Sequence, residues 1–278
     1  MIGSSAKAPL IEVFHSIQGE GRYVGRPMTF LRVATCPIRC SYCDTPNSYQ
    51  ASADFVTQTA SGERREPNPV SASRALELVV DAAAEFEGPD AAAAFEGPDA
   101  AAACEGPEAP CLSVTGGEPL VAPRFVRELG ELMHGRGWRV HLETAALDPT
   151  ALQSCIDGVD HLSADYKLPG TLLPQSSDPG DFREAHVACC NLAVERGLSV
   201  DVKLVLTAAL DHAVVTAAMD DLAHLRDAVV LVLQPVTPFG AETESLPAAA
   251  LQRHVAAARS RGFSFLVLPQ VHRHLGLR

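Results

Sequence analysis

Three cysteines lie within eight positions of one another, in the segment Cys36-Pro-Ile-Arg-Cys40-Ser-Tyr-Cys43. Thiolates this close repel one another unless a cation neutralises them, so a metal centre that prefers sulfur is the natural occupant. A structural zinc site takes four ligands, commonly from two C-x2-C pairs, and the sequence has no second pair of that kind. An iron–sulfur cube that only carries electrons also takes four cysteines. Three cysteines therefore predict a 4Fe–4S cluster with one iron open to a substrate or cofactor.

A tyrosine and a later glycine-rich turn narrow this chemistry. Tyr42 directly precedes Cys43, and Gly116-Gly117-Glu118-Pro119 follows a short apolar segment. A C-x3-C-x2-C motif with an aromatic residue before its last cysteine resembles the signature of radical S-adenosylmethionine enzymes, in which the open iron binds the methionyl amino and carboxylate groups. In that superfamily a GGEP turn approaches the amino group, because glycine has no Cβ to obstruct it. The carboxylate of Glu118 can pair with the same ammonium.

Apolar, β-branched segments that alternate with amphipathic ones must position these motifs. Strands separated by helices imply parallel pairing through right-handed crossovers, so the predicted class is α/β. The expected strands are Leu10–His15, Thr29–Ala34, Cys111–Thr115, Arg139–Glu143, His161–Ala164, Val200–Leu206, Val229–Gln234 and Ser264–Leu268, and the expected helices are Val70–Ala84, Pro123–His134, Asp181–Glu195, Ala213–Arg226 and Pro247–Arg261. No G-x-G-x-x-G follows the first strand, so a partial (β/α) barrel of the radical S-adenosylmethionine type is favoured over a Rossmann sheet.

Composition limits the classes of partner. The chain has 278 residues, 47% of them hydrophobic, and a formal net charge of −12, which suits one domain, 1–278, with a buried core. Without clustered Lys and Arg, nucleic acid is not an expected partner. Without a signal peptide or an apolar run near the ~20 residues of a membrane span, we expect a cytoplasmic protein with no membrane partner. The triplet Glu-Gly-Pro recurs at 87–89, 96–98 and 105–107, which predicts a low-complexity surface insertion at 83–110.

Three further segments resemble 7-carboxy-7-deazaguanine synthase, a radical S-adenosylmethionine family. They are Ser-Ile-Gln-Gly-Glu-Gly at 16–21, Phe-Leu-Arg at 30–32 with Asp44-Thr45 after the last cysteine, and Leu-Pro-Gln-Val-His-Arg-His at 268–274. The resemblance implies a carbon–nitrogen lyase that converts 6-carboxy-5,6,7,8-tetrahydropterin to 7-carboxy-7-deazaguanine with loss of ammonia, for queuosine or 7-deazapurine biosynthesis. It also implies a 4Fe–4S cluster, S-adenosylmethionine and Mg2+ as cofactors, a flavodoxin- or ferredoxin-type reductant, and a homodimer.

The resemblance assigns roles to residues at matching positions. Beside the cluster ligands Cys36, Cys40 and Cys43, Thr45 is the expected Mg2+ ligand. The expected S-adenosylmethionine contacts are Tyr42, Asp44, Gly116, Gly117, Glu118, Glu143, Ser163 and Asp165, and the expected pterin contacts are Ile17, Gln18, Gly19, Arg32, Thr115, Gln270 and His272. Arg32 suits the substrate carboxylate because a guanidinium binds carboxylates through two parallel hydrogen bonds. Glu143 and Ser163 end strands, where an α/β barrel places its site.

Two departures and two alternatives remain open. Relatives often read Ser-Pro-Lys where this chain has Ser163-Ala-Asp-Tyr-Lys167, which leaves the roles of Asp165 and Lys167 open, and the tail continues to Arg278. The same cysteine motif would also fit an activase that generates a glycyl radical on a partner protein. The chain could also be an iron–sulfur electron carrier. Of these three interpretations, only the resemblance to 7-carboxy-7-deazaguanine synthase predicts a small acidic substrate.

Overall fold

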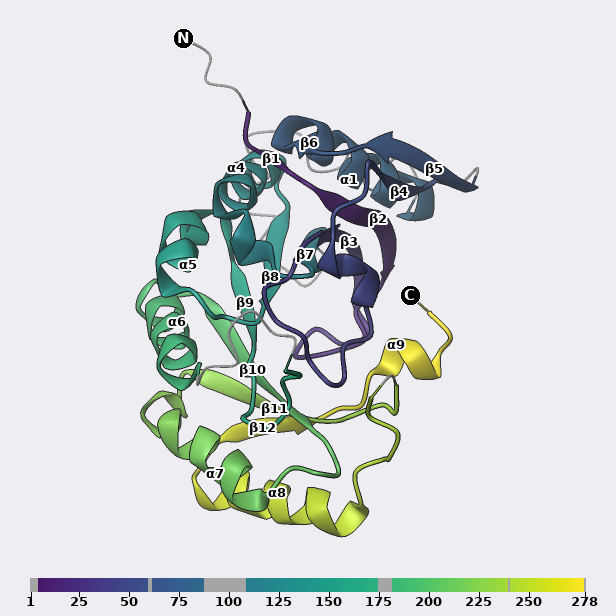
Figure 1. Ribbon diagram of the computed structural model, residues 1–278. Helices are drawn as coiled ribbons and strands as arrows, with labels where there is room; N and C mark the ends of the chain where they lie inside the picture. Colours follow the sequence, from purple (N-terminus) through teal and green to yellow (C-terminus); the bar gives the residue numbers. More distant parts are fainter. Residues whose placement is uncertain (1–4, 60–61, 88–108, 175–181, 240, 278) are drawn as a thin grey trace.

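A long mixed sheet organises the protein, which was analysed as a computed structural model describing residues 5–59, 62–87, 109–174, 182–239 and 241–277 (Figure 1). The strand order is β12-β11-β10-β9-β8-β7-β3-β2-β4-β5. Their bounds are β2 Leu10–Ile17, β3 Pro27–Val33, β4 Asp54–Thr59, β5 Gly62–Pro67, β7 Cys111–Gly116, β8 Arg139–Thr144, β9 His161–Asp165, β10 Ser199–Leu206, β11 Val229–Pro235 and β12 Ser264–Val267. A second sheet pairs β1 (Lys7–Ala8) with β6 (Val70–Ser71).

The parallel part of the sheet follows the order of the chain. β3 pairs in parallel with β7, and each strand from β7 to β12 pairs in parallel with the next. The helices that accompany these strands are α1 (Ala72–Glu87), α4 (Pro123–His134), α5 (Pro149–Cys155), α6 (Arg183–Glu195), α7 (His212–Asp221) and α8 (Ala248–Ser260), and α9 (Val271–His274) ends the chain. Figure 1 shows α4 to α8 along one outer side of the sheet. This is the open arrangement of strands and helices that the sequence predicts.

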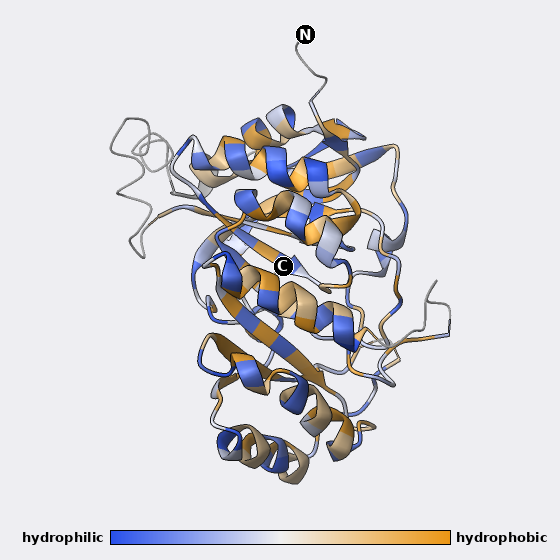
Figure 2. Cartoon of the chain, turned by 90° about the vertical axis from the view of Figure 1, so that its left-hand side faces the viewer, coloured by the Kyte–Doolittle hydropathy of each residue, from blue (hydrophilic) through white to orange (hydrophobic). Residues whose placement is uncertain are grey.

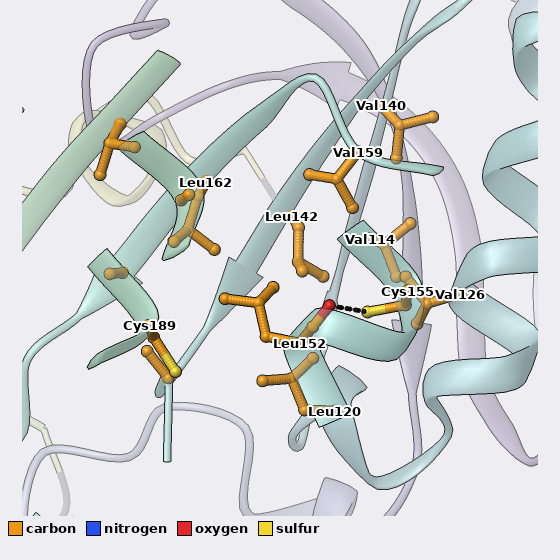
Figure 3. Packing of buried hydrophobic residues seen from close by; sticks show 14 of the residues in the cluster. Val114, Leu120, Val126, Val140, Leu142, Leu152, Cys155, Val159, Leu162 and Cys189 are labelled. Atoms are coloured by element: carbon orange, nitrogen blue, oxygen red, sulfur yellow. Dashed lines mark hydrogen bonds between the residues drawn. The ribbon is translucent and has the colours of Figure 1, made fainter. Parts of the chain in front are cut away.

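The core lies between the sheet and these helices. Val114, Leu142 and Leu162 on the strands are fully buried and pack near Val126 of α4 and Leu152 of α5 (Figure 3). Burying each such side chain contributes roughly 1.5–3 kcal/mol, so this layer stabilises the fold. In Figure 2 the helices combine hydrophilic and hydrophobic residues, as expected for helices with one face on a core. Among the described residues, no helix is long and apolar enough to cross a membrane.

Cysteines outside the C-x3-C-x2-C motif serve this core. Cys155, Cys189 and Cys190 are fully buried, and the Cys155 thiol donates to the Leu152 carbonyl at 3.4 Å (Figure 3). Burial raises the pKa of Cys155 to about 12, which keeps it a neutral thiol. A buried neutral thiol behaves as a small apolar side chain. Cys104 lies outside the described residues.

The other face of the central strands is polar, because successive side chains of a strand alternate between faces. The register aligns Ser113, His141, His161 and Ser199 in one row across β7 to β10. Two residues further along, Glu143, Ser163 and Asp201 form a second row. A third row pairs Asp165 with Lys203. Layers of side chains that fill the inner face are typical of α/β barrels.

Some predicted boundaries were wrong. Val70 and Ser71 belong to strand β6, and helix α1 begins at Ala72. The same helix runs to Glu87 with Ala83 buried, so the predicted insertion cannot begin at residue 83. Its segment 88–108 lies outside the described residues. The hairpin of β4 and β5 was not predicted, because β5 reads Gly-Glu-Arg-Arg-Glu-Pro and has no apolar alternation.

Candidate active site

An open cavity of about 170 Å³ lies at the carboxyl ends of the central parallel strands. It is lined by the ends of β7, β8, β9, β10 and β11, by the loops after β2 and β3, and by the C-terminal segment. Every predicted site residue except Glu118 lines it: Ile17, Gln18, Gly19, Arg32, Cys36, Cys40, Tyr42, Cys43, Asp44, Thr45, Thr115, Gly116, Gly117, Glu143, Ser163, Asp165, Gln270 and His272. Segments more than 250 positions apart in the chain therefore meet at one cavity.

The three cysteines of the motif lie in the loop after β3, and all are partly buried. Burial raises the pKa of Cys36 to about 11 and also raises that of Cys40. Metal binding must therefore displace protons from these thiols. The described residues contain no three or more His, Cys, Asp or Glu that converge on a single metal ion. A cube has a different requirement, because each thiolate binds its own iron, and three half-buried thiols on one cavity wall fit that requirement.

The backbone that leads into the cysteine loop packs directly against Gly116 and Gly117. A Cβ on Gly116 would lie 2.3 Å from the Val33 carbonyl oxygen, and one on Gly117 would lie 2.1 Å from the Thr35 carbonyl oxygen. Gly116 also has φ +121°, where a side chain is strained. Gly117 N–H donates to Val33 at 2.8 Å. The sequence suggested that these glycines admit a ligand, but the close approach in the structure is to the backbone that leads into Cys36.

Glu118, for which the sequence predicts a direct S-adenosylmethionine contact, lies behind the cavity wall. Its side chain is buried and accepts hydrogen bonds from Leu120 N (2.9 Å), Ala145 N (2.8 Å) and the Thr144 hydroxyl (2.5 Å). Burial raises the pKa of Glu118. Because its carboxylate accepts these bonds at the ends of β7 and β8, Glu118 holds the strand ends together, and its contact with S-adenosylmethionine stays a prediction.

Glu143 accepts hydrogen bonds from three side chains, one in the loop after β2 and two on β7. Gln18 Nε2 donates to Glu143 Oε1 at 2.6 Å, Ser113 to the same oxygen at 3.3 Å, and Thr115 to Oε2 at 3.1 Å. Burial alone would raise the pKa of Glu143, but His141, Lys203 and the Gln18 amide outweigh it and lower the pKa. Glu143 is therefore a carboxylate anion in the cavity wall, with Gln18 and Thr115 fixed beside it.

A positive and a negative side chain lie near the cysteine loop in the cavity. They belong to Arg32 and Asp44, and the Thr45 hydroxyl lies beside them. Arg32 Nε lies 3.0 Å from Glu12 Oε1, so this atom forms a structural ion pair while the side chain lines the cavity. Thr45 donates its hydroxyl proton to Asp44 at 2.9 Å. Burial would raise the pKa of Asp44, but Arg32 and the hydrogen bond from Thr45 outweigh it and lower the pKa. A carboxylate beside a hydroxyl oxygen offers the hard oxygen ligands that Mg2+ prefers.

The C-terminal segment closes one side of the cavity. Val271 N–H donates to the Gly19 carbonyl at 3.0 Å, and a Cβ on Gly19 would lie 2.1 Å from His272 Nδ1. Gln270 Nε2 donates to Glu20 at 2.8 Å and to Asp44 at 3.1 Å. Gln270 and His272 are thus packed against the loop after β2, where the sequence placed the pterin contacts.

A buried charge network was not predicted. Lys203 Nζ lies 2.5 Å from Glu20 and 3.7 Å from Asp165, and Lys167 Nζ lies 2.7 Å from Asp165. Burial would lower the pKa of Lys203, but Glu20 and Asp165 outweigh it and raise the pKa. The signal was in the sequence: Asp201 and Lys203 alternate with apolar residues in β10, which places two charges on its inner face. Lys167 also lies over the Tyr42 ring at 5.2 Å.

Gln234 is a second residue that sequence reasoning missed. It lines the cavity at the end of β11, is 3% exposed, and its Oε1 has no hydrogen-bond partner among the described residues. A buried polar atom without a partner is costly unless a ligand or water satisfies it. The signal was a polar residue directly after the buried apolar run of β11.

The comparisons with known proteins agree with this arrangement. The chain matches no protein-family model. It is 29% identical to 7-carboxy-7-deazaguanine synthase of Methanothermobacter thermautotrophicus over 287 residues, covering 98% of each chain. It is also 29% identical to the 7-carboxy-7-deazaguanine synthase of Geobacter sulfurreducens, covering 98% of this chain and 99% of the relative. The resemblance expected from the motifs therefore extends along the whole chain.

Solved structures support the fold class. QueE from Escherichia coli is similar with a TM-score of 0.50 and 17% identity, covering 94% of this chain and 93% of that one. Streptococcus suis SuiB, solved with S-adenosylmethionine bound, has a TM-score of 0.50 and 11% identity, covering 84% of this chain and 48% of that one. The predicted α/β fold of the radical S-adenosylmethionine type is confirmed. The roles predicted for individual residues stay predictions.

Proposed function

We propose that this chain, which resembles 7-carboxy-7-deazaguanine synthases over its whole length, converts 6-carboxy-5,6,7,8-tetrahydropterin to 7-carboxy-7-deazaguanine with loss of ammonia. The reaction makes it a carbon–nitrogen lyase of queuosine or 7-deazapurine biosynthesis. One observation carries the proposal: the three cysteines share a single cavity with the loop that bears Gln18 and with the C-terminal Gln270 and His272. A cysteine motif alone would fit many radical enzymes, whereas this combination suits a small polar substrate.

Cys36, Cys40 and Cys43 would hold the 4Fe–4S cluster, and S-adenosylmethionine bound at its open iron supplies the hydrogen-abstracting chemistry. Tyr42, Asp44, Gly116, Gly117, Ser163 and Asp165 line the cavity around these thiols and would contact that cofactor. Glu143 would accept hydrogen bonds from its ribose hydroxyls. Glu118 would act indirectly, by fixing the strand ends that carry these residues.

The substrate would occupy the part of the cavity that faces the loop after β2. Arg32 would bind its carboxylate, since a guanidinium has five N–H donors and the Arg32 side chain lines the cavity while its Nε lies beside Glu12. Gln18, the backbone at Ile17 and Gly19, and Thr115 would read the hydrogen-bonding edge of the pterin. Thr45 and substrate oxygens would bind Mg2+, with water filling the remaining positions. Gln270 and His272 would cover the bound substrate.

Three further features of this proposal come from the family resemblance. The cluster needs one electron from outside, so a flavodoxin- or ferredoxin-type reductant would serve it. Protomers would associate as a homodimer, which sedimentation of the purified protein tests. The protein would work in the cytoplasm, where its cysteines remain reduced.

Anaerobic turnover after iron–sulfur reconstitution tests the function directly. The mixture contains reductant, S-adenosylmethionine, Mg2+ and 6-carboxytetrahydropterin, and mass spectrometry follows the products. The expected result is 7-carboxy-7-deazaguanine in excess of the S-adenosylmethionine consumed. Deoxyadenosine without that product would keep the radical chemistry and contradict the substrate. Neither product from cluster-loaded protein would favour the electron-carrier alternative.

A further inference from the structure

Four polar side chains lie under the cavity and are not used in the function proposed above. Ser113, His141 and His161 occupy adjacent positions in the row below Glu143 and Ser163, and Asp201 adjoins Ser163 in the upper row. Each of the four is at most 3% exposed, and none lines the cavity. Burying polar groups costs free energy unless they are hydrogen-bonded, so apolar residues would fill this layer more cheaply.

One arm of this group ends on Glu143. His141 Nδ1 lies 3.0 Å from the Ser113 hydroxyl, and that hydroxyl donates to Glu143 Oε1 at 3.3 Å. The Ser113 hydroxyl donates its only proton to Glu143, so its oxygen must accept the hydrogen bond from His141. This requires that His141 carry a proton on Nδ1. His141 and Ser113 thus act on the carboxylate through one continuous chain of donors.

The other arm ends on Ser163. The Ser163 hydroxyl donates to Asp201 Oδ2 at 3.2 Å, and His161 Nε2 contacts Asp201 Oδ1. The two arms meet where the His141 and His161 rings stack, with centroids 4.9 Å apart and planes 10° apart. Tyr23 packs edge-on against both rings, at 5.7 and 4.7 Å. Because Tyr23 lies in the loop that carries Gln18, the same group also braces that loop.

We propose that Ser113, His141, His161 and Asp201 are positioning residues that fix Glu143 and Ser163 to bind the ribose of S-adenosylmethionine. This inference rests on the proposed function. With Gln18 and Ser113 on Oε1 and Thr115 on Oε2, the Glu143 carboxylate presents its remaining lone pair on Oε2 in a fixed direction, which suits a ribose hydroxyl. Pre-organised partners lower the entropy cost of binding, so disruption of the group weakens affinity for this ligand.

A matched pair of variants separates positioning from packing. In His141→Asn the amide nitrogen can replace Nδ1 as donor to Ser113, whereas His141→Leu fills similar space with no donor. Each reconstituted variant, at matched iron content, is titrated with S-adenosylmethionine by calorimetry, and its melting temperature is measured. We expect His141→Leu to bind about tenfold more weakly, equivalent to about 1.4 kcal/mol, and His141→Asn to remain within about threefold of the parent.

Two further variants complete the test. Ser113→Ala breaks the link to Glu143 and should weaken binding like His141→Leu. His254→Leu is the control, since His254 is equally buried but pairs with His212 between α7 and α8. It should lower the melting temperature and leave affinity unchanged.

The possible outcomes distinguish this inference from the proposed function. Equal affinities for His141→Leu and His141→Asn, or losses that follow the melting temperature across all variants, would overturn the positioning role while parent binding stays normal. Weaker binding of the pterin alone would overturn the choice of ligand. A parent protein that binds no S-adenosylmethionine would contradict the proposed function as well.

Discussion

Gln18 and Glu143 stand 125 positions apart in the chain, yet Gln18 Nε2 donates to Glu143 Oε1 at 2.6 Å. This bond ties the loop after β2 to the end of β8.

In Glu143→Gln one carboxylate oxygen becomes an amide donor, which must face a donor from Gln18, Ser113 or Thr115. Hydrogen bonds to a charged group contribute about 1.5–3 kcal/mol, so we expect product formation to fall roughly 10- to 100-fold with the iron content unchanged. Glu131→Gln, in an exposed pair with Arg127, should retain full activity. Full activity of Glu143→Gln would remove this carboxylate from the site.

The cluster assignment predicts a contrast between cysteines. Cys40→Ala should lose most of its iron and produce no deoxyadenosine, because a cube bound by two thiolates is poorly held. Cys190→Ala, on the buried face of α6, should keep the iron and instead melt at a lower temperature, since it leaves a small cavity. Iron analysis and melting curves of both variants check this. Deoxyadenosine at the parent rate from Cys40→Ala would refute the cluster ligand.

The packing of the cysteine loop against Gly116 and Gly117 predicts an effect on metal loading from a residue that binds no metal. Gly117→Ala places a Cβ 2.1 Å from the Thr35 carbonyl oxygen and must displace the backbone before Cys36. We expect a loss of stability of about 1–3 kcal/mol and lower iron incorporation. Gly135→Ala is the control, because Gly135, like Gly117, has no positive φ, and its added Cβ would meet nothing nearer than 3.4 Å. Normal iron content in Gly117→Ala would show that the loop can move without losing the cluster.

The C-terminal segment predicts an effect on substrate affinity. Arg273 lies 3.3 Å from Asp44 Oδ2 and stacks over Phe239 at 4.7 Å, which holds the segment that carries Gln270 and His272. Arg273→Ala should raise KM for the pterin several-fold with a smaller change in kcat, because in the proposed function the segment would cover the substrate and not the cofactor. The exposed Arg259→Ala is the control. An unchanged KM would mean that the segment does not cover the substrate.

Two buried histidines predict how stability depends on pH. Burial lowers the pKa of His141 to about 4 and that of His186 to about 3, against 6.5 when unfolded. At a pH between each folded value and 6.5, the unfolded chain binds more protons than the folded chain. The free energy of unfolding is therefore at its full value above about pH 6.5 and falls as the pH drops. At pH 5 each histidine costs about 2 kcal/mol. Denaturant titrations from pH 7 to 5 should show a smaller decline in His186→Asn than in the parent, and an unchanged decline in the exposed control His274→Asn. An identical decline in all three proteins would assign it to other groups.

Much of the fold could be read from the sequence because its signals were local. Buried parallel strands such as β11 are continuous apolar runs, and the amphipathic α4 begins and ends where its pattern predicts. Helix α5 was missed because its seven residues are too few for a periodic pattern, although Asp148 caps it. The β4–β5 hairpin was missed because its outer strand depends on pairing with its neighbour.

The residues of the cavity were predicted better than their contacts. Motifs identified Gly117 and Glu118. The Thr35 carbonyl that approaches Gly117 and the Ala145 amide that donates to Glu118 come from segments distant in the chain. The alternation in β10 places Asp201 and Lys203 on one face of that strand, but only the register shows that they lie beside Ser163 and Asp165. Such pairings depend on tertiary structure, which no local pattern encodes.

The packing of the cysteine loop against Gly116 and Gly117 also has a consequence during protein synthesis. Cys36 leaves the ribosome 80 residues before Gly116, as the difference 116 − 36 gives. At synthesis rates of about 5–20 residues per second, the cysteine loop waits roughly 4–16 s before the strand that supports it exists. During that interval the three thiols are exposed to oxidants and to competing metals. A cluster delivered after β3 has paired with β7 would meet a supported loop, and reducing conditions during synthesis would protect the thiols until then.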